Sequence, residues 1–198
     1  MEREIIVLRP YQKRIVEEVK GKNSLIILPT GAGKTLIAIE AIANAFGSKA
    51  TTASSSKAVF FVPTCLLVEQ QANAMRERIC HLRIAEFMGG KKLVEDFDIL
   101  VSTPKAFLVA QNTHASIHWE NFVIIVFDEV HHVLKDHPYR KIAQRITSAR
   151  LRDSRLNLLQ VVGLTASLTY SCTDSAVKKS IESIVRELQI VHMATGFI

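Results

Sequence analysis

The chain has 198 residues, of which 48% are hydrophobic and 22% are charged. A chain this apolar can bury a core, which excludes intrinsic disorder, and the length suits one domain or two small ones. The excess of 25 Lys and Arg over 19 Asp and Glu gives a formal charge of +6, which makes polyanions plausible partners without identifying one.

The expected elements alternate along the chain. Five short apolar runs, rich in Val, Ile and Phe, predict buried strands at 24–28, 58–62, 98–101, 122–127 and 159–164. Apolar residues at helical spacing predict helices at 11–20, 34–46, 66–80, 139–147 and 175–188. A small, polar stretch at 47–57 and a second connection at 149–157 are expected to be exposed. This alternation predicts one doubly wound α/β domain over 1–198, with a mainly parallel sheet and helices on both faces.

Cysteine content and the lack of targeting segments suggest where the protein resides. The cysteines are Cys65, Cys80 and Cys172, an odd number without CxxC spacing, which argues against a disulfide framework and a zinc knuckle. No apolar run approaches the length of a membrane span, and the N-terminus has no signal-peptide core. We therefore expect an intracellular protein, with the cytoplasm favoured over the nucleus.

A phosphate-binding loop is predicted at Leu28–Thr35 (LPTGAGKT), between an expected strand and an expected helix. Gly31 and Gly33 let backbone N–H groups approach phosphate, and the helix N-terminus adds positive potential. Lys34 would reach the β- and γ-phosphates and Thr35 would place its hydroxyl on Mg²⁺, so ATP and Mg²⁺ are the expected cofactors. The alternative is a glycine-containing turn that happens to carry Lys-Thr, because Leu28 stands where the strict pattern has glycine.

An acidic box follows the strand at 122–127. Two carboxylates at the end of a buried parallel strand are costly unless they have a cation or a chemical task. Asp128 would bind Mg²⁺ through water, and Glu129 would orient or deprotonate the attacking water. Together with Lys34 they form the expected catalytic set; the alternative is a strand end with solvated acids. The nearby His131, His132 and His137 lack companion ligands of a recognised zinc type.

Six motifs in order resemble the first RecA-like domain of a superfamily 2 DExH-box helicase. They are LRPYQ at 8–12, LPTGAGKT at 28–35, VPTCLLVEQQ at 62–71, Thr103-Pro104, DEVH at 128–131 and GLTAS at 163–167. Together with DHPYR at 136–140, they are most similar to the RIG-I-like receptor and Dicer group of double-stranded-RNA-dependent ATPases. Archaeal Hef-like and Fanconi-anaemia-type DNA helicases share much of this layout.

The resemblance implies further nucleotide-binding residues. Gln12 would read adenine through its amide, and Arg9 would pack on the base. Thr30, Gly31, Ala32 and Gly33 would surround the phosphates together with Lys34 and Thr35. The alternative for Arg9 and Gln12 is an ordinary helix start, since Pro10 favours the first helical position.

The resemblance also implies coupling and nucleic-acid residues. His131, Thr165 and Ser167 would couple the state of the nucleotide to the grip on nucleic acid, although Thr and Ser after a strand also suit a helix cap. The backbone of nucleic acid would contact residues that could otherwise be plain strand ends: Pro63, Thr64, Gly89, Gly90, Thr103 and Pro104. Such contacts read no base sequence, so double-stranded RNA is favoured only by the resemblance and DNA stays open.

The expected function is therefore the ATP-binding half of a nucleic-acid-dependent DExH ATPase. We expect no second RecA-like domain in 1–198, although such a domain, in cis or in trans, completes the ATP site of these helicases. The chain alone should bind ATP–Mg²⁺ weakly with little turnover. The alternatives are half of a DNA-remodelling helicase, or a non-catalytic module that binds nucleic acid or a partner; no membrane partner is expected.

The positive charge is concentrated in one segment. Seven basic residues and two aspartates between Lys135 and Arg155 supply five of the six net charges. Ligands gather at the carboxyl ends of parallel strands, whereas this segment should end near the opposite edge. We expect Arg150, Arg152 and Arg155 to lie there on an exposed connection, away from the ATP site.

Overall fold

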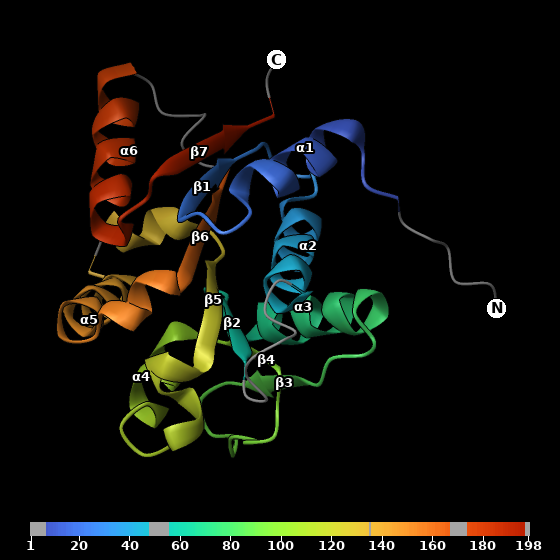
Figure 1. Ribbon diagram of the computed structural model, residues 1–198, viewed down its shortest axis with the longest axis vertical. Helices are drawn as coiled ribbons and strands as arrows, with labels where there is room; N and C mark the ends of the chain where they lie inside the picture. The colour runs from blue at the N-terminus through green and yellow to red at the C-terminus, as the bar shows by residue number, and fades with distance from the viewer. Residues whose placement is uncertain (1–6, 48–55, 135, 167–173, 197–198) are drawn as a thin grey trace.

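Seven parallel strands form a single sheet in the part of the chain that the structure describes, residues 7–47, 56–134, 136–166 and 174–196 of a computed structural model (Figure 1). Their order across the sheet is β3–β4–β2–β5–β6–β1–β7. The strands are β1 (Ser24–Ile27), β2 (Lys57–Phe61), β3 (Ile84–Phe87), β4 (Ile99–Ser102), β5 (Phe122–Phe127), β6 (Gln160–Thr165) and β7 (His192–Thr195).

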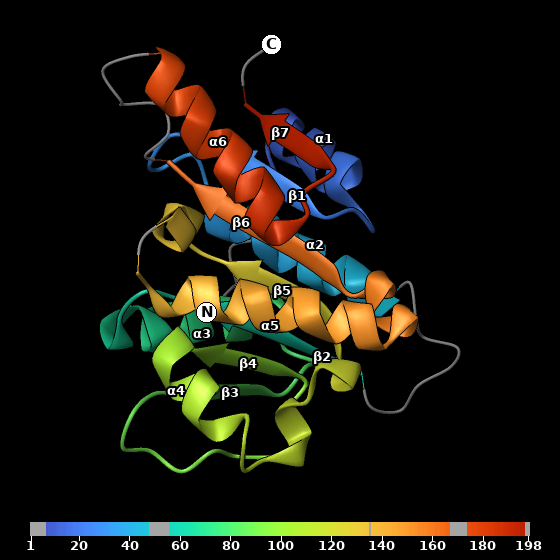
Figure 2. The ribbon, with the colours of Figure 1, turned by 90° about the vertical axis from the view of Figure 1, so that its left-hand side faces the viewer.

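Helices cover both faces of this sheet (Figure 2). One face carries α1 (Pro10–Val19), α2 (Lys34–Gly47) and α3 (Cys65–Arg78), and the other carries α4 (Pro104–Ala110), α5 (Pro138–Arg152) and α6 (Asp174–Leu188). Short 3-10 helices, η1 (Ala115–Ile117), η2 (Trp119–Asn121), η3 (Val130–Leu134) and η4 (Ser154–Leu158), lie in the connections. The predicted fold class, a doubly wound α/β domain, is confirmed.

Two hydrophobic cores, one on each face, explain why the strands are apolar throughout. Along β2, Val59 and Phe61 point into the core under α4–α6, whereas Ala58 and Phe60 point into the core under α1–α3. Successive side chains of a strand point to opposite faces, so a sheet covered on both sides needs apolar residues at every position.

Three elements had no counterpart in the sequence prediction: β3, β7 and α4. The two strands are the edges of the sheet, and their side chains are only partly buried. They therefore lack the continuous apolar run that marks the central strands. Helix α4 has only 7 residues, with Pro104 in its first turn, which is too short for a clear helical period. Residues 48–55 of the expected polar loop lie outside the described residues.

The expected end of this helix at Thr147 is wrong, because α5 continues to Arg152. The apolar face of the helix persists through Ile146 and Ala149, which are both buried, and this burial stabilises the added turn. The expectation that Arg150 lies on an exposed connection is wrong: its side chain is buried and donates to the carbonyls of Leu156 and Leu159.

All carboxyl ends of the strands face one edge of the sheet because every pairing is parallel. The phosphate-binding loop, the acidic box and the segments after β2, β3 and β4 therefore share that edge. Within the described residues, no helix is long and apolar enough to cross a membrane.

Candidate nucleotide and nucleic-acid site

The loop between β1 and α2 turns on two glycines with left-handed backbone angles. Gly31 has a φ of 80° and Gly33 a φ of 76°, which side chains rarely adopt. A methyl group on Gly33 would also collide with the amide of Gln12. The ammonium of Lys34 donates to the carbonyls of Leu28 and Pro29, at 3.1 and 3.2 Å. Those bonds must be exchanged for phosphate oxygens if Lys34 is to reach a ligand.

Helix α1 packs directly on this loop. The Tyr11 hydroxyl donates to the carbonyl of Ala32 at 2.7 Å, and Gln12 Nε2 donates to the same carbonyl at 3.2 Å. Gln12 Oε1 accepts from the backbone N–H of Arg9 at 2.8 Å, at the start of the helix. An amide has two donors and two acceptor lone pairs, so each end of Gln12 keeps one further hydrogen bond for a ligand. The helix-start and adenine-reading interpretations are therefore compatible.

The acidic box lies at the end of β5, next to the loop. Asp128 is only 9% exposed. Burial, and secondarily the charge of Glu129, raise the pKa of its carboxyl from 3.8 to about 6, while the positive charge of Lys34 acts in the opposite direction. A carboxylate that is costly to ionise in its own protein is one that a bound cation would stabilise.

Backbone strain occurs at Glu129, whose φ of 48° lies in the left-handed region. Such a conformation costs a non-glycine residue roughly 1–3 kcal/mol, and it is common at functional sites. His131 Nδ1 lies 3.4 Å from Glu129 Oε2 and 3.2 Å from Thr165 Oγ1. The structure thus brings the acidic box and the end of β6 together through His131. Ser167, the third coupling residue predicted from the sequence, lies outside the described residues.

Magnesium fits these residues better than a metal held by protein alone. In the described parts of the chain, no group of three or more His, Cys, Asp or Glu side chains could hold a metal ion. Mg²⁺ in nucleotide sites takes one or two carboxylates and completes its shell with water and phosphate oxygens. Asp128 and the hydroxyl of Thr35 would supply the protein ligands.

The residues predicted to contact nucleic acid follow β2, β3 and β4. Thr64, Gly89 and Gly90 are exposed, and Pro63 is partly exposed. Thr103 and Pro104 are buried at the start of α4, so their side chains have little surface to offer a ligand. The sheet order separates this group from the phosphate-binding loop and the acidic box, which follow β1 and β5.

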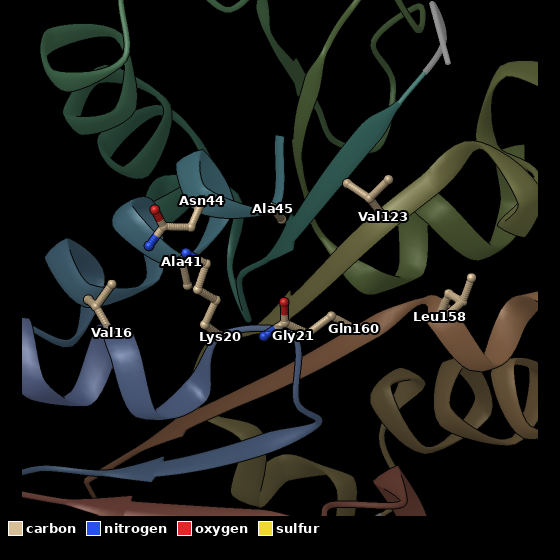
Figure 3. Close-up of a pocket in the computed structure, with 9 residues that line it drawn as sticks. All are labelled: Val16, Lys20, Gly21, Ala41, Asn44, Ala45, Val123, Leu158 and Gln160. Carbon is tan, nitrogen blue, oxygen red and sulfur yellow. The ribbon is translucent and has the colours of Figure 1, made fainter. Parts of the chain in front are cut away.

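A hollow of about 110 Å³ lies elsewhere, at the amino ends of the strands (Figure 3). It is lined by Val16, Lys20, Gly21, Ala41, Asn44, Ala45, Val123, Leu158 and Gln160. Because Val123 and Gln160 stand near the starts of β5 and β6, this hollow is at the edge opposite the phosphate-binding loop. It contributes nothing to the candidate site.

Two tyrosines at the site were not predicted to act there. Tyr11 stands within LRPYQ and Tyr139 within DHPYR, so the motifs contained both. Their hydroxyls bond the carbonyls of Ala32, Phe61 and Asp128. The sequence gives no signal for bonds to backbone groups that are far away in the chain.

Comparison with known proteins defines the family. The family model described as type III restriction enzyme, res subunit, matches residues 5–169. That match covers most of the chain, and the chain therefore belongs to this family of helicase-type domains.

Curated relatives agree with the sequence resemblance. The chain is 31% identical over 170 residues to endoribonuclease Dicer homolog 1 of Arabidopsis thaliana, covering 80% of this chain and 9% of the relative. It is 31% identical over 172 residues to the human antiviral innate immune response receptor RIG-I, covering 81% of this chain and 18% of the relative. It is 34% identical over 174 residues to mouse ATP-dependent RNA helicase DHX58, covering 81% of this chain and 25% of the relative. The chain thus spans at most a quarter of these three relatives.

A solved structure supports the fold independently. The crystal structure of the Pyrococcus furiosus Hef helicase domain is similar to this structure with a TM-score of 0.74 and 27% sequence identity. The similarity covers 98% of this chain and 38% of that chain. The expected similarity to the RIG-I, Dicer and Hef groups is therefore confirmed.

Proposed function

We propose that this chain is the ATP-binding domain of a nucleic-acid-dependent ATPase of the DExH-box helicase type, directed to double-stranded RNA. The observation that carries the proposal is that Lys34, on the loop after β1, and the acid pair after β5 lie at the same edge of the sheet. Burial raises the pKa of Asp128 to about 6, and the positive charge of Lys34 opposes that rise. A lysine on a glycine loop and an acid pair at the same sheet edge are parts that ATP hydrolysis requires.

Each residue has a role in this proposal. Backbone N–H groups of Thr30–Gly33 hold the phosphates, and Lys34 neutralises charge on the β- and γ-phosphates. Thr35 and Asp128 hold Mg²⁺, which supplies charge neutralisation between the phosphates when bound. Glu129 orients or deprotonates the attacking water, and His131 lies against the Glu129 carboxylate on one side. Gln12 and Arg9 select and cover the adenine base.

Nucleic acid binds in this proposal along the other half of the same edge. Exposed positions after β2 and β3 present a hydroxyl and two glycine backbone N–H groups to phosphates, at Thr64, Gly89 and Gly90. The similarity to Dicer homologues and RIG-I favours double-stranded RNA. The similarity to the Hef helicase domain supports DNA as the second candidate. Binding of this chain to double-stranded RNA and to forked DNA at matched salt separates the two.

Turnover is proposed to need a second RecA-like domain. An arginine contributed from a second domain or partner is worth roughly 10³–10⁵ in rate. We expect the 198-residue chain to bind ATP weakly and to hydrolyse it at a negligible rate. Robust RNA-stimulated hydrolysis by the purified chain would contradict this part of the proposal.

Fluorescent ATP titration with Mg²⁺ tests the nucleotide site. Lys34→Ala removes the phosphate-binding ammonium and should weaken binding at least tenfold, since a charge-assisted bond contributes about 1.5–3 kcal/mol. Chelating Mg²⁺ should weaken wild-type binding as well. The matched control is Lys22→Ala, which removes an exposed lysine before β1 at the opposite sheet edge. Equal affinities for wild type and Lys34→Ala would contradict the site and favour a non-catalytic module.

A further inference from the structure

The carboxyl edge of the sheet divides into two halves between β5 and β2. The phosphate-binding loop and the acidic box follow β1 and β5, and the proposed nucleic-acid residues follow β2, β3 and β4. Strands β2 and β5 are neighbours, and they are the two strands at which the halves meet. At this boundary the backbone N–H of Asp128 donates to the carbonyl of Phe61 at 2.9 Å.

A single side chain from α5 joins the same two strand ends. The Tyr139 hydroxyl lies 3.1 Å from the carbonyl oxygen of Phe61 and 2.9 Å from that of Asp128, and it donates to both. A phenol has one proton, so the two carbonyls share one donor. A small movement of either carbonyl changes the bond to the other.

The ring of Tyr139 is held so that its hydroxyl stays at this point. The residue has no exposed surface. Its ring meets Phe127 edge-on, with centroids 5.1 Å apart, and lies 4.8 Å from the ring of His137. Burial raises the pKa of the hydroxyl well above its ordinary value, so the group remains a proton donor at any physiological pH.

Packing alone does not account for the hydroxyl. A phenylalanine would fill the same space among Phe61, Phe127 and His137 without burying a polar atom, and burial of a hydroxyl is unfavourable unless it is hydrogen-bonded. The carbonyls that satisfy it belong to the residue before Val62-Pro63-Thr64 and to the residue before the strained Glu129. The hydroxyl is therefore bonded to the backbone directly before both candidate functional segments.

We propose that Tyr139 is a positioning residue that links the nucleic-acid loop after β2 to the acidic box. The proposal rests on the proposed function. Contact of a phosphate backbone with the segment after Phe61 moves that carbonyl, and the shared hydroxyl passes the movement to Asp128 and Glu129. Binding of ATP–Mg²⁺ at Asp128 acts on the nucleic-acid loop by the same route, because coupling between two sites is reciprocal.

The test measures this coupling with Tyr139→Phe. The affinity of the chain for a fluorescent ATP analogue with Mg²⁺ is measured without and with saturating double-stranded RNA. In the wild type we expect the two affinities to differ by roughly fivefold, the lower end of ordinary coupling. In Tyr139→Phe we expect each ligand alone to bind within about twofold of wild type, and the ratio of the two ATP affinities to fall to about one.

Controls separate coupling from stability. Ile142→Val trims a buried side chain of the same helix without touching either carbonyl, so it should lower the melting temperature yet keep the wild-type ratio. If the wild type binds neither ATP nor RNA, the proposed function fails, and this inference fails with it. If the wild type binds both without coupling, or Tyr139→Phe keeps the full ratio, only the role of Tyr139 is overturned.

A second measurement covers the case in which Tyr139→Phe does not fold. Amide hydrogen exchange of the wild type is then compared without and with RNA. RNA should change the exchange of the Asp128 and Glu129 amides, which lie in the other half of the edge. Unchanged exchange at these two amides, with RNA bound, overturns the proposal.

Discussion

At the scale of single residues, Asp128 carries an unfavourable charge that serves the proposed metal site. Its pKa is raised in the folded protein, so the folded state binds the proton more tightly than the unfolded state does. The associated stability is complete below about pH 4 and is lost as the pH rises through about 6. Stability and metal binding therefore place opposite demands on this carboxylate, as is common at active sites.

Replacement of Asp128 by asparagine should accordingly stabilise the ligand-free protein at neutral pH. A rise from 3.8 to about 6 corresponds to at most ~3 kcal/mol, which is a melting temperature several degrees higher for a domain of this size. The gain should vanish near pH 4, and the variant should lose Mg²⁺-dependent ATP binding. Calorimetry across pH 4–8 measures the gain in melting temperature, with Asp136→Asn, at an exposed aspartate, as the charge-matched control. A variant less stable than wild type at pH 7.5 would refute the explanation.

At the scale of elements, η3 packs closely against β6 through Val130 and Gly163. A methyl group on Gly163 would lie 3.0 Å from both methyl groups of Val130, so Val130 would have to move by a few tenths of an ångström to accommodate it. This contact sets how far the DEVH segment sits from the sheet, and with it the reach of His131 to Thr165.

Gly163→Ala should therefore destabilise the fold by roughly 1–3 kcal/mol, because the added methyl must push η3 outward. Val130→Ala removes the two methyl groups in the way. The double variant should be more stable than the sum of the single effects predicts by about 1 kcal/mol. Urea unfolding of the four proteins gives this coupling, and additive effects would show that the two residues do not press on each other.

The end of α5 shows why one arginine of the basic segment differs from its neighbours. Arg150 is buried and donates to Leu156, Leu159 and, at 2.6 Å, to Gln189 Oε1, so it joins the connections that lead into β6 and β7. Burial lowers the pKa of its guanidinium, and these acceptors offset that cost. Arg155 instead pairs with Asp153 in an exposed turn.

At the scale of the whole molecule, the end of the basic segment lies away from the candidate site. The connection from Arg152 to Arg155 precedes β6, so it lies at the amino ends of the parallel strands. The phosphate-binding loop lies at the other edge, and salt screens exposed charges over about 8–10 Å. The net charge alone is therefore a poor guide to the ligand site.

Neutralising Arg152 and Arg155 to glutamine should leave ATP affinity within about twofold of wild type at physiological salt, because these side chains are remote and screened. Arg150→Met, in contrast, should lower stability by ~2–4 kcal/mol, since the buried Leu159 carbonyl loses the donor that Arg150 gives it. ATP titration and urea unfolding of Arg152→Gln, Arg155→Gln and Arg150→Met check both expectations. A large loss of ATP affinity in the exposed variants would mean that this connection contributes to the site.

Prediction from the sequence was strongest where a residue's own chemistry restricts its place. Central strands such as β5 are apolar at every position, so the sequence predicted them. Glycines just before Lys34 are typical of a phosphate-binding loop, so the sequence predicted that loop as well. The edge strands β3 and β7 mix polar and apolar residues and were missed. Arg150 was misplaced because nothing local distinguishes a buried arginine from an exposed one; its acceptors at Leu159 and Gln189 become neighbours only when the chain folds.

Hydrophobic periodicity and motif spacing are local properties of the chain, so they were enough to predict the class of fold, the family resemblance and the candidate nucleotide residues. The tertiary structure decided how those residues meet: that Asp128 is buried within reach of the charge of Lys34, that His131 stands between Glu129 and Thr165, and that the hydroxyl of Tyr139 joins the ends of β2 and β5. Burial, pKa and shared hydrogen bonds depend on which distant segments become neighbours. The order of strands in the sheet sets those neighbours, and no local pattern in the chain encodes that order.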